Sequence, residues 1–194
     1  MDFERVMNAS ASPSFVYLTW DGEFSEVFMN NFKQMSSVRI LVTSAAVMAL
    51  YVTVMYFTQG FAFGQYQIRI ATALYALAAP FPFLIVPLGL ANLLSNLVLG
   101  SLGPLDAIGG FAAGLLTSAA VYAIRRFRLN DVLLAIPVTF IPGLLVPVWL
   151  SYLLDLPYSV LAVSLCVGQI IPGITGVLLV KALERVGVMK RPAA

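Results

Sequence analysis

The feature that most restricts the fold is the stretch over residues 70–105, which contains no Asp, Glu, Lys or Arg. At about 1.5 Å per residue, one straight helix over this stretch would be about 54 Å long. The hydrocarbon core of a bilayer is only about 30 Å thick, and about 20 residues cross it as a helix. We therefore expect the stretch to fold back on itself inside a membrane.

Three prolines, Pro80, Pro82 and Pro87, supply the expected break. Proline lacks a backbone N–H and disfavours helix in the residue before it. We predict a short helix over residues 70–79 and a longer one over residues 83–99. Two crossings of the membrane thus come from one uncharged stretch.

The composition of the whole chain supports a membrane protein, because 60% of its residues are hydrophobic and only 10% are charged. The remaining apolar runs predict helices over residues 40–57, 106–124, 132–154 and 158–183. We therefore expect an all-α integral membrane protein with six transmembrane helices in residues 37–187. Residues 1–36 are expected to form a cytosolic or interfacial tail, and residues 188–194 a cytosolic one.

The basic residues predict the orientation, since short cytosolic loops collect Lys and Arg. The predicted outer loops contain only Arg69, with Asp106 and Asp155. We therefore place the chain in the cell membrane with both termini in the cytoplasm. The inward set is Lys33, Arg39, Arg125, Arg126, Arg128, Arg185, Lys190 and Arg191.

Several classes of chemistry lack the residues they need. The chain has no histidine, and its one cysteine, Cys166, lies in an apolar run. These counts argue against a disulfide framework, a zinc site or a histidine-based catalytic triad, and we expect no metal and no cofactor. A net charge of +2 without a basic patch argues against nucleic acid as a partner.

The polar residues inside the predicted spans are the candidates for a binding site, because polar groups in lipid are costly and usually functional. Arg69, Thr72 and Tyr75 follow one another at a spacing of three, which places them on one helical face. Asn92 and Asn96 share another face. Amides of this kind, together with Gln169 in the last helix, suit the donor and acceptor edges of a planar base.

A competing interpretation is open for each candidate, since a buried Asn or Gln in a membrane helix also bonds neighbouring helices. Tyr75 or Trp149 is a candidate for stacking on a planar ligand. Asp106 follows a Gly-Pro pair at the start of a helix, where capping competes with a role in ligand binding.

Small residues mark two possible contact faces. Ala45 and Ala49 are four residues apart on the first helix, and this spacing alone favours neither packing within the bundle nor docking to a partner. Gly110 and Gly114 repeat the pattern in the fourth helix, where we expect internal packing.

Four segments taken together resemble the QueT family: Q-I-R-I-A-T-A-L, P-L-G-L-A-N-L-L, G-S-L-G-P-L-D-A-I-G-G and V-S-L-C-V-G-Q-I-I. The resemblance covers about residues 39–186. Members of this family are substrate-binding S components of energy-coupling factor (ECF) transporters, associated with uptake of queuosine precursors. It implies a small-molecule substrate, a membrane lipid environment, and a coupling transmembrane subunit with ATPase subunits. It also implies that Ala45 and Ala49 dock the coupling subunit.

The chain departs from the family at two positions. Thr72 and Gln169 stand where the family has glutamates, so two carboxylates are replaced by neutral hydrogen-bonding groups. A carboxylate in an apolar pocket is costly unless a cation faces it, and its loss predicts a ligand without a positive amine. Among the implied deazaguanine bases, this favours the neutral cyano form over forms that carry a basic amine.

We expect a binding subunit of an uptake transporter, for a queuosine or archaeosine precursor, and not an enzyme. An S component for another vitamin-like heterocycle is the nearest alternative. A more distant one is an intramembrane enzyme, although its ionisable candidates are only Arg69, Asp106 and Asp155. A scaffold subunit is the remaining class. The chain has no G-x-x-x-x-G-K-[ST] loop for ATP, so an uptake function requires partner ATPases.

Overall fold

The computed structural model describes residues 37–64, 66–99 and 102–187. The chain divides into two compact units between Val42 and Thr43, and the bundle described below is formed by the residues from Thr43 onward. The two expected tails, residues 1–36 and 188–194, lie outside the described residues.

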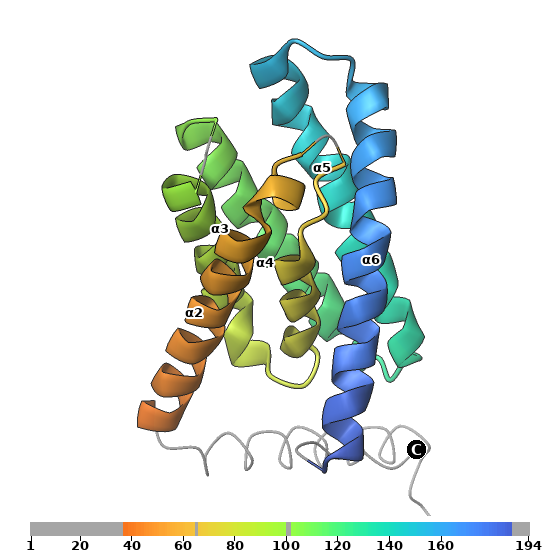
Figure 1. Cartoon of the computed structure of the whole chain (residues 1–194). Helices are drawn as coiled ribbons and strands as arrows, with labels where there is room; N and C mark the ends of the chain where they lie inside the picture. Colours follow the sequence, from red (N-terminus) through yellow and green to blue (C-terminus); the bar gives the residue numbers. More distant parts are fainter. Residues whose placement is uncertain (1–36, 65, 100–101, 188–194) are drawn as a thin grey trace, which may run out of the picture. The chain divides into compact units, whose positions relative to one another are not determined.

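Most of the described residues are helical, and they contain five segments long and apolar enough to cross a membrane. This confirms the predicted all-α membrane bundle. Two of the five segments begin with a 3₁₀ turn, which is η3 (Pro82–Leu84) before α3 and η4 (Asp131–Leu134) before α5. The α-helices, coloured from orange to blue in Figure 1, are α2 (Ser37–Ala62), α3 (Ile85–Leu99), α4 (Pro104–Arg126), α5 (Ala135–Leu154) and α6 (Tyr158–Arg185).

The short helix expected over residues 70–79 is a 3₁₀ helix, η2 (Ile70–Ala78), which has three residues per turn. Nine residues at a rise of about 2 Å span about 18 Å, less than the hydrocarbon core. Residues 67–69 before it are not helical, and in Figure 1 this yellow segment leads from the end of α2 into η2. Non-helical backbone is tolerated at membrane depth only where it is buried in protein or lines a water-filled cavity. Arg69 is buried and Gln67 and Ile68 are half-buried, and every residue of η2 after Ile70 is buried.

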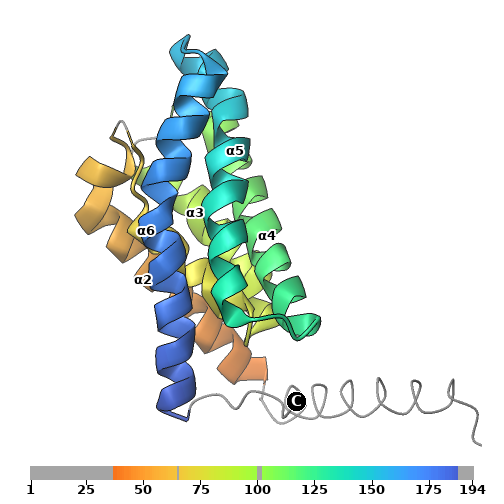
Figure 2. The ribbon, with the colours of Figure 1, turned by 90° about the vertical axis from the view of Figure 1, so that its right-hand side faces the viewer.

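Helices α5 and α6 lie side by side in both Figure 1 and Figure 2. Their close approach depends on two glycines. A Cβ placed on Gly143 of α5 would lie 2.6 Å from the Cys166 sulfur, and one placed on Gly173 of α6 would overlap the Thr139 hydroxyl. Small residues at such positions let membrane helices pack backbone to backbone.

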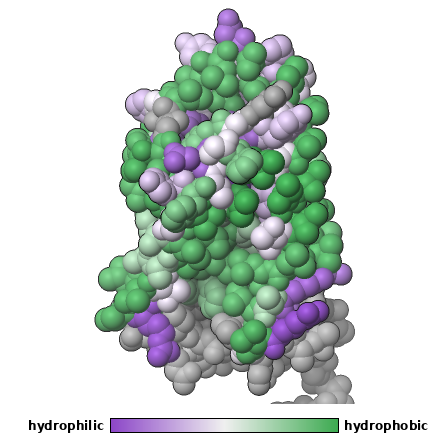
Figure 3. Space-filling model, in the orientation of Figure 1, coloured by the Kyte–Doolittle hydropathy of each residue, from purple (hydrophilic) through white to green (hydrophobic). Residues whose placement is uncertain are grey.

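Most of the face shown in Figure 3 is hydrophobic, and hydrophilic residues gather in groups toward its upper and lower parts. Large apolar side chains are exposed on all five long helices, among them Phe57 at 79% and Val163 at 67%. In water such a surface would aggregate, whereas in a bilayer it faces lipid. The chain is therefore a multi-pass membrane protein.

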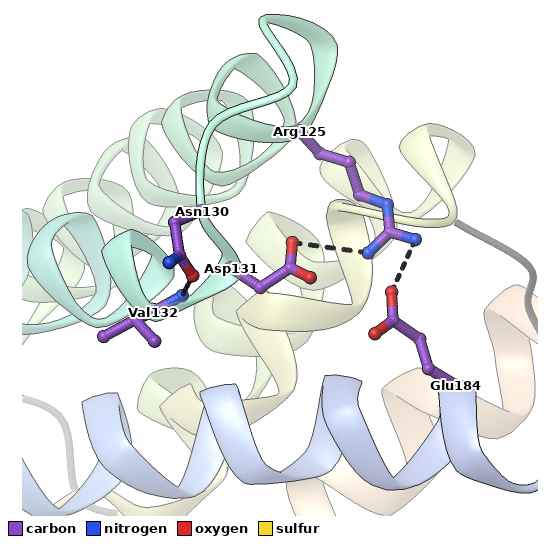
Figure 4. Close-up of polar contacts among 5 residues, drawn as sticks. All are labelled: Arg125, Asn130, Asp131, Val132 and Glu184. Carbon is purple, nitrogen blue, oxygen red and sulfur yellow. Dashed lines mark hydrogen bonds and ion pairs between the residues drawn. The ribbon is translucent and has the colours of Figure 1, made fainter. Parts of the chain in front are cut away.

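An ion-pair cluster joins three elements where α4 ends. Arg125 lies in the last turn of α4, with its Nη1 3.5 Å from Asp131 Oδ1 of η4 and its Nη2 2.9 Å from Glu184 Oε1 of α6 (Figure 4). Asn130 precedes η4 and accepts a hydrogen bond from the Val132 N–H at 3.0 Å. The guanidinium thus lies between two carboxylates.

Candidate functional site

Arg69 immediately precedes η2 and is only 5% exposed. Its Nη1 donates hydrogen bonds to Asn92 Oδ1 at 3.3 Å and to Asn96 Oδ1 at 3.2 Å. The guanidinium carbon lies 5.0 Å from the centre of the Phe63 ring, a distance at which the ring face attracts a cation. The charge of Arg69 is therefore held by two neutral amides and one aromatic ring.

The two asparagines present a continuous amide face from α3, as their spacing of four predicts. Asn92 uses both of its amide protons, donating to the Tyr75 hydroxyl and to the Gly110 carbonyl, each at 2.8 Å. Asn96 donates to the backbone carbonyl of Asp106 at 3.2 Å. The asparagines thereby connect Arg69 with η2 and with the first half of α4.

Glycines of α4 make room for these amides. A Cβ on Gly110 would lie 2.5 Å from Asn96 Nδ2 and 3.2 Å from Asn92 Oδ1. A Cβ on Gly114 would lie 3.0 Å from the Gly89 Cα and 3.2 Å from the Tyr75 hydroxyl. The expectation that Gly110 and Gly114 serve internal packing is therefore confirmed.

Tyr75 is fully enclosed at the centre of the bundle, at 1% exposure. Its hydroxyl lies 3.2 Å from that of Tyr51 on α2, and the two rings stack with their centres 5.8 Å apart. One face of Tyr75 is therefore already covered by Tyr51. A ligand that stacks on Tyr75 has only the other face available.

Two further candidate residues, Thr72 and Gln169, join η2 to α6. Thr72 Oγ1 lies 2.7 Å from the Arg69 carbonyl oxygen and 2.8 Å from Gln169 Oε1, so one hydroxyl proton serves two acceptors. Gln169 Nε2 donates to the backbone carbonyl of Gln67 at 3.1 Å, and Thr139 of α5 donates to the Gln169 carbonyl oxygen at 3.1 Å. Thr72 and Gln169 are thus direct neighbours.

Asp106 is 4% exposed and lies in the first turn of α4. The cap of that helix is Gly103, at φ 104°, a conformation that suits glycine, so Asp106 is not the capping residue. Its Oδ1 accepts a hydrogen bond from the Trp149 indole at 3.0 Å. A negative charge near a helix N-terminus is also favoured by the helix dipole.

The structure brings all six candidate ligand-binding residues into one buried hydrogen-bonded group, with exposures of 1% to 5%. The period of three in Arg69, Thr72 and Tyr75 fits a 3₁₀ helix, in which every third side chain is aligned. Sequence reasoning missed Tyr51 and Thr139, which bond to this group, and Phe63, whose half-buried ring lies against the Arg69 guanidinium. Tyr51 could have been found from its hydroxyl inside an apolar span, but no sequence signal pairs it with Tyr75.

The small-residue stripe of α2 lies apart from this group. Ala45 and Ala49 are both exposed, while α2 turns Tyr51 and Met55 inward. Among the five apolar segments, α2 is the least buried, at 17% of its most apolar window. Within the described residues, the stripe is therefore not used for internal packing.

Comparison with known families now adds to this geometry. The family model described as QueT transporter matches residues 41–185. The chain belongs to this family. Neither a search of curated proteins nor a search of solved structures finds a match. The QueT match begins one turn into α2, at residue 41, and runs to the end of α6, and it includes all six candidate ligand-binding residues.

Proposed function

We propose that this QueT family member is the substrate-binding membrane subunit of an ECF-type uptake transporter and that it binds a queuosine or archaeosine precursor. The observation that carries the proposal is the cluster of Arg69, Thr72, Tyr75, Asn92, Asn96 and Gln169, which is polar, buried and enclosed by an apolar bundle. A scaffold subunit has no need of polar groups that converge at one depth, and polar residues inside a membrane are usually functional.

A deazaguanine base suits the hydrogen-bonding groups of the cluster. The base is planar and carries donors and acceptors along its edge, and the two asparagines and Gln169 offer both kinds of group. In the structure these amides bond to the side chains of Arg69, Thr72 and Tyr75 and to backbone carbonyls. A ligand that breaks these hydrogen bonds must offer new ones to the same amides, because each buried amide left unpaired costs about 1–3 kcal/mol.

Binding is tested with the purified chain in detergent or nanodiscs, by calorimetric titration with deazaguanine bases and with a panel of vitamins of similar size. Saturable binding of a deazaguanine and no binding of the vitamins is the expected result. Saturable binding of a vitamin instead, with no response to any deazaguanine, would show an S component for another heterocycle.

Energy for uptake is proposed to come from a coupling transmembrane subunit and ATPase subunits. The exposed pair Ala45 and Ala49 supports docking through α2, because small side chains allow a partner helix to approach closely. Replacing either alanine by Trp should abolish co-purification of the coupling subunit and uptake, and leave ligand affinity unchanged. Leu50→Trp is the matched control, since Leu50 is exposed on the same helix but points about 100° away from Ala49. Normal co-purification by both stripe variants would exclude this docking face.

The proposed orientation places both termini in the cytoplasm. Arg128, after α4, and Asp155, after α5, are separated by one crossing, and both lie at exposed positions. Cysteines at these positions, in a chain with Cys166→Ala, should react with an impermeant reagent from opposite sides, that at 128 from the cytoplasm. Labelling of both from one side would contradict the orientation.

A further inference from the structure

The guanidinium of Arg69 has five N–H donors, and the described residues occupy only part of them. Both bonds that the structure gives it come from Nη1, to the oxygens of Asn92 and Asn96. Nε is buried and has no hydrogen-bond partner. No described residue accepts a bond from Nη2 either. The open donors therefore lie along one edge, from Nε to Nη2.

Arg69 also makes no ion pair with a described residue. The ion pairs of the described residues join Arg125 to Asp131 and to Glu184, and none includes Arg69. Asp106, which Asn96 contacts only through its backbone carbonyl, has its carboxylate bonded by the Trp149 indole and lies in the first turn of α4. The unmet hydrogen-bonding capacity of the cluster is thus concentrated at Arg69, and it is positive.

We propose that the Nε–Nη2 edge of Arg69 receives an acceptor-only edge of a planar ligand and thereby selects neutral or anionic ligands over cationic ones. This inference rests on the proposed function and specifies the ligand class of the same site. The two N–H groups of such an edge are parallel, and they match planar acceptors better than the single point charge of Lys does.

The surroundings strengthen this selection. Thr72 and Gln169 contribute no charge, and their polar atoms are already bonded to each other and to the carbonyls of Arg69 and Gln67. An ammonium group placed against Arg69 would meet a like charge at low dielectric and would leave Nε without an acceptor. A ring carbonyl with a neighbouring nitrile presents acceptors only.

The test uses the full-length protein and two deazaguanine bases that differ at one substituent, nitrile in one and protonated aminomethyl in the other. Calorimetric titration should give at least about tenfold tighter binding of the cyano base. Arg69→Lys keeps the charge and loses the paired donors, so it should weaken the cyano base about tenfold and keep the order of the two bases. Arg69→Gln removes the charge, and the affinity ratio should fall toward one.

Arg126→Lys and Arg126→Gln are the matched controls, because Arg126 is exposed at the end of α4. Both variants should leave the affinities for the two bases unchanged. Gln169→Glu adds a carboxylate beside Thr72 and should improve binding of the aminomethyl base selectively. Equal affinity for the two bases in the unmutated protein, or an affinity ratio that Arg69→Gln does not change, would overturn the inference while the proposed function stands. Binding of neither base would overturn both.

Discussion

Two arginines in this bundle are largely withdrawn from solvent, and their surroundings differ in one decisive respect. Arg125 lies between the carboxylates of Asp131 and Glu184, whereas Arg69 contacts two neutral amides and a phenyl ring. A compensated guanidinium ties helices together and needs nothing more. An uncompensated one has free energy to gain from a ligand, and we propose that this difference distinguishes a structural cluster from a binding site.

The largest effect on the free energy of unfolding is expected when the charge of Arg125 is removed. Arg125→Gln removes the cation that pairs with both Asp131 and Glu184. Loss of one member of a buried ion pair costs about 3–5 kcal/mol, and the 22% exposure of the Glu184 side chain places this case near 3 kcal/mol. Reversible unfolding in mixed micelles measures it, with exposed Arg126→Gln as the control.

Adding Asp131→Asn and Glu184→Gln to Arg125→Gln should recover most of this loss, because no unpaired charge then remains. A triple variant as unstable as the single one would mean that Arg125 acts through packing and not through charge. The ratio of the affinities for the cyano and the aminomethyl base should be the same in the unmutated protein, the single variant and the triple variant.

The second largest effect is expected at Arg69, where a substitution should reduce ligand affinity more than stability. Arg69→Gln should lower affinity for the ligand about a hundredfold, equivalent to about 2.7 kcal/mol. Its free energy of unfolding should change by no more than about 1 kcal/mol, because the variant removes a buried charge as well as two hydrogen bonds. Titration and unfolding of one preparation give both values. A loss of stability as large as that of Arg125→Gln would make Arg69 a structural residue and end the comparison.

A smaller effect on ligand affinity is expected when the space around the Asn92 and Asn96 amides is reduced. Gly110→Ala places a methyl group against Asn96 Nδ2 and should weaken ligand binding about tenfold, by displacing the amides that hold Arg69. Gly60→Ala is the control, since a Cβ there meets nothing within 4 Å. That variant should leave binding unchanged and stabilise α2 by about 0.5–1 kcal/mol. Equal affinities for Gly110→Ala and Gly60→Ala would show that the amide positions do not matter.

The smallest effect concerns the support of the Arg125 cluster. Asn130→Ala removes the side-chain acceptor for the Val132 N–H before η4, and such caps contribute about 1 kcal/mol. The loss should appear in the unfolding measurement and not in the titration. A change in ligand affinity would show that the two clusters are coupled through α4 or α5.

The number and order of apolar segments could be predicted from the sequence, because the cost of burying charge in lipid acts on each segment locally. The candidate list for the site followed from the same rule, since polar side chains in apolar spans are few. Even the period of three at Arg69, Thr72 and Tyr75 was present in the sequence. The sequence predicted a helical face there without distinguishing an α-helix from a 3₁₀ helix, and the 3₁₀ form is seen only in the structure, where η2 is buried after Ile70.

Only the tertiary structure decided which polar groups meet. Arg69 and Arg125 are both arginines at the ends of apolar spans, and the sequence does not show what each of them contacts. Their partners come from other helices: Asn92 and Asn96 in one case, Asp131 and Glu184 in the other. Whether a buried charge is compensated depends on distances of a few ångströms between segments far apart in the chain, and these distances are set by how the helices pack.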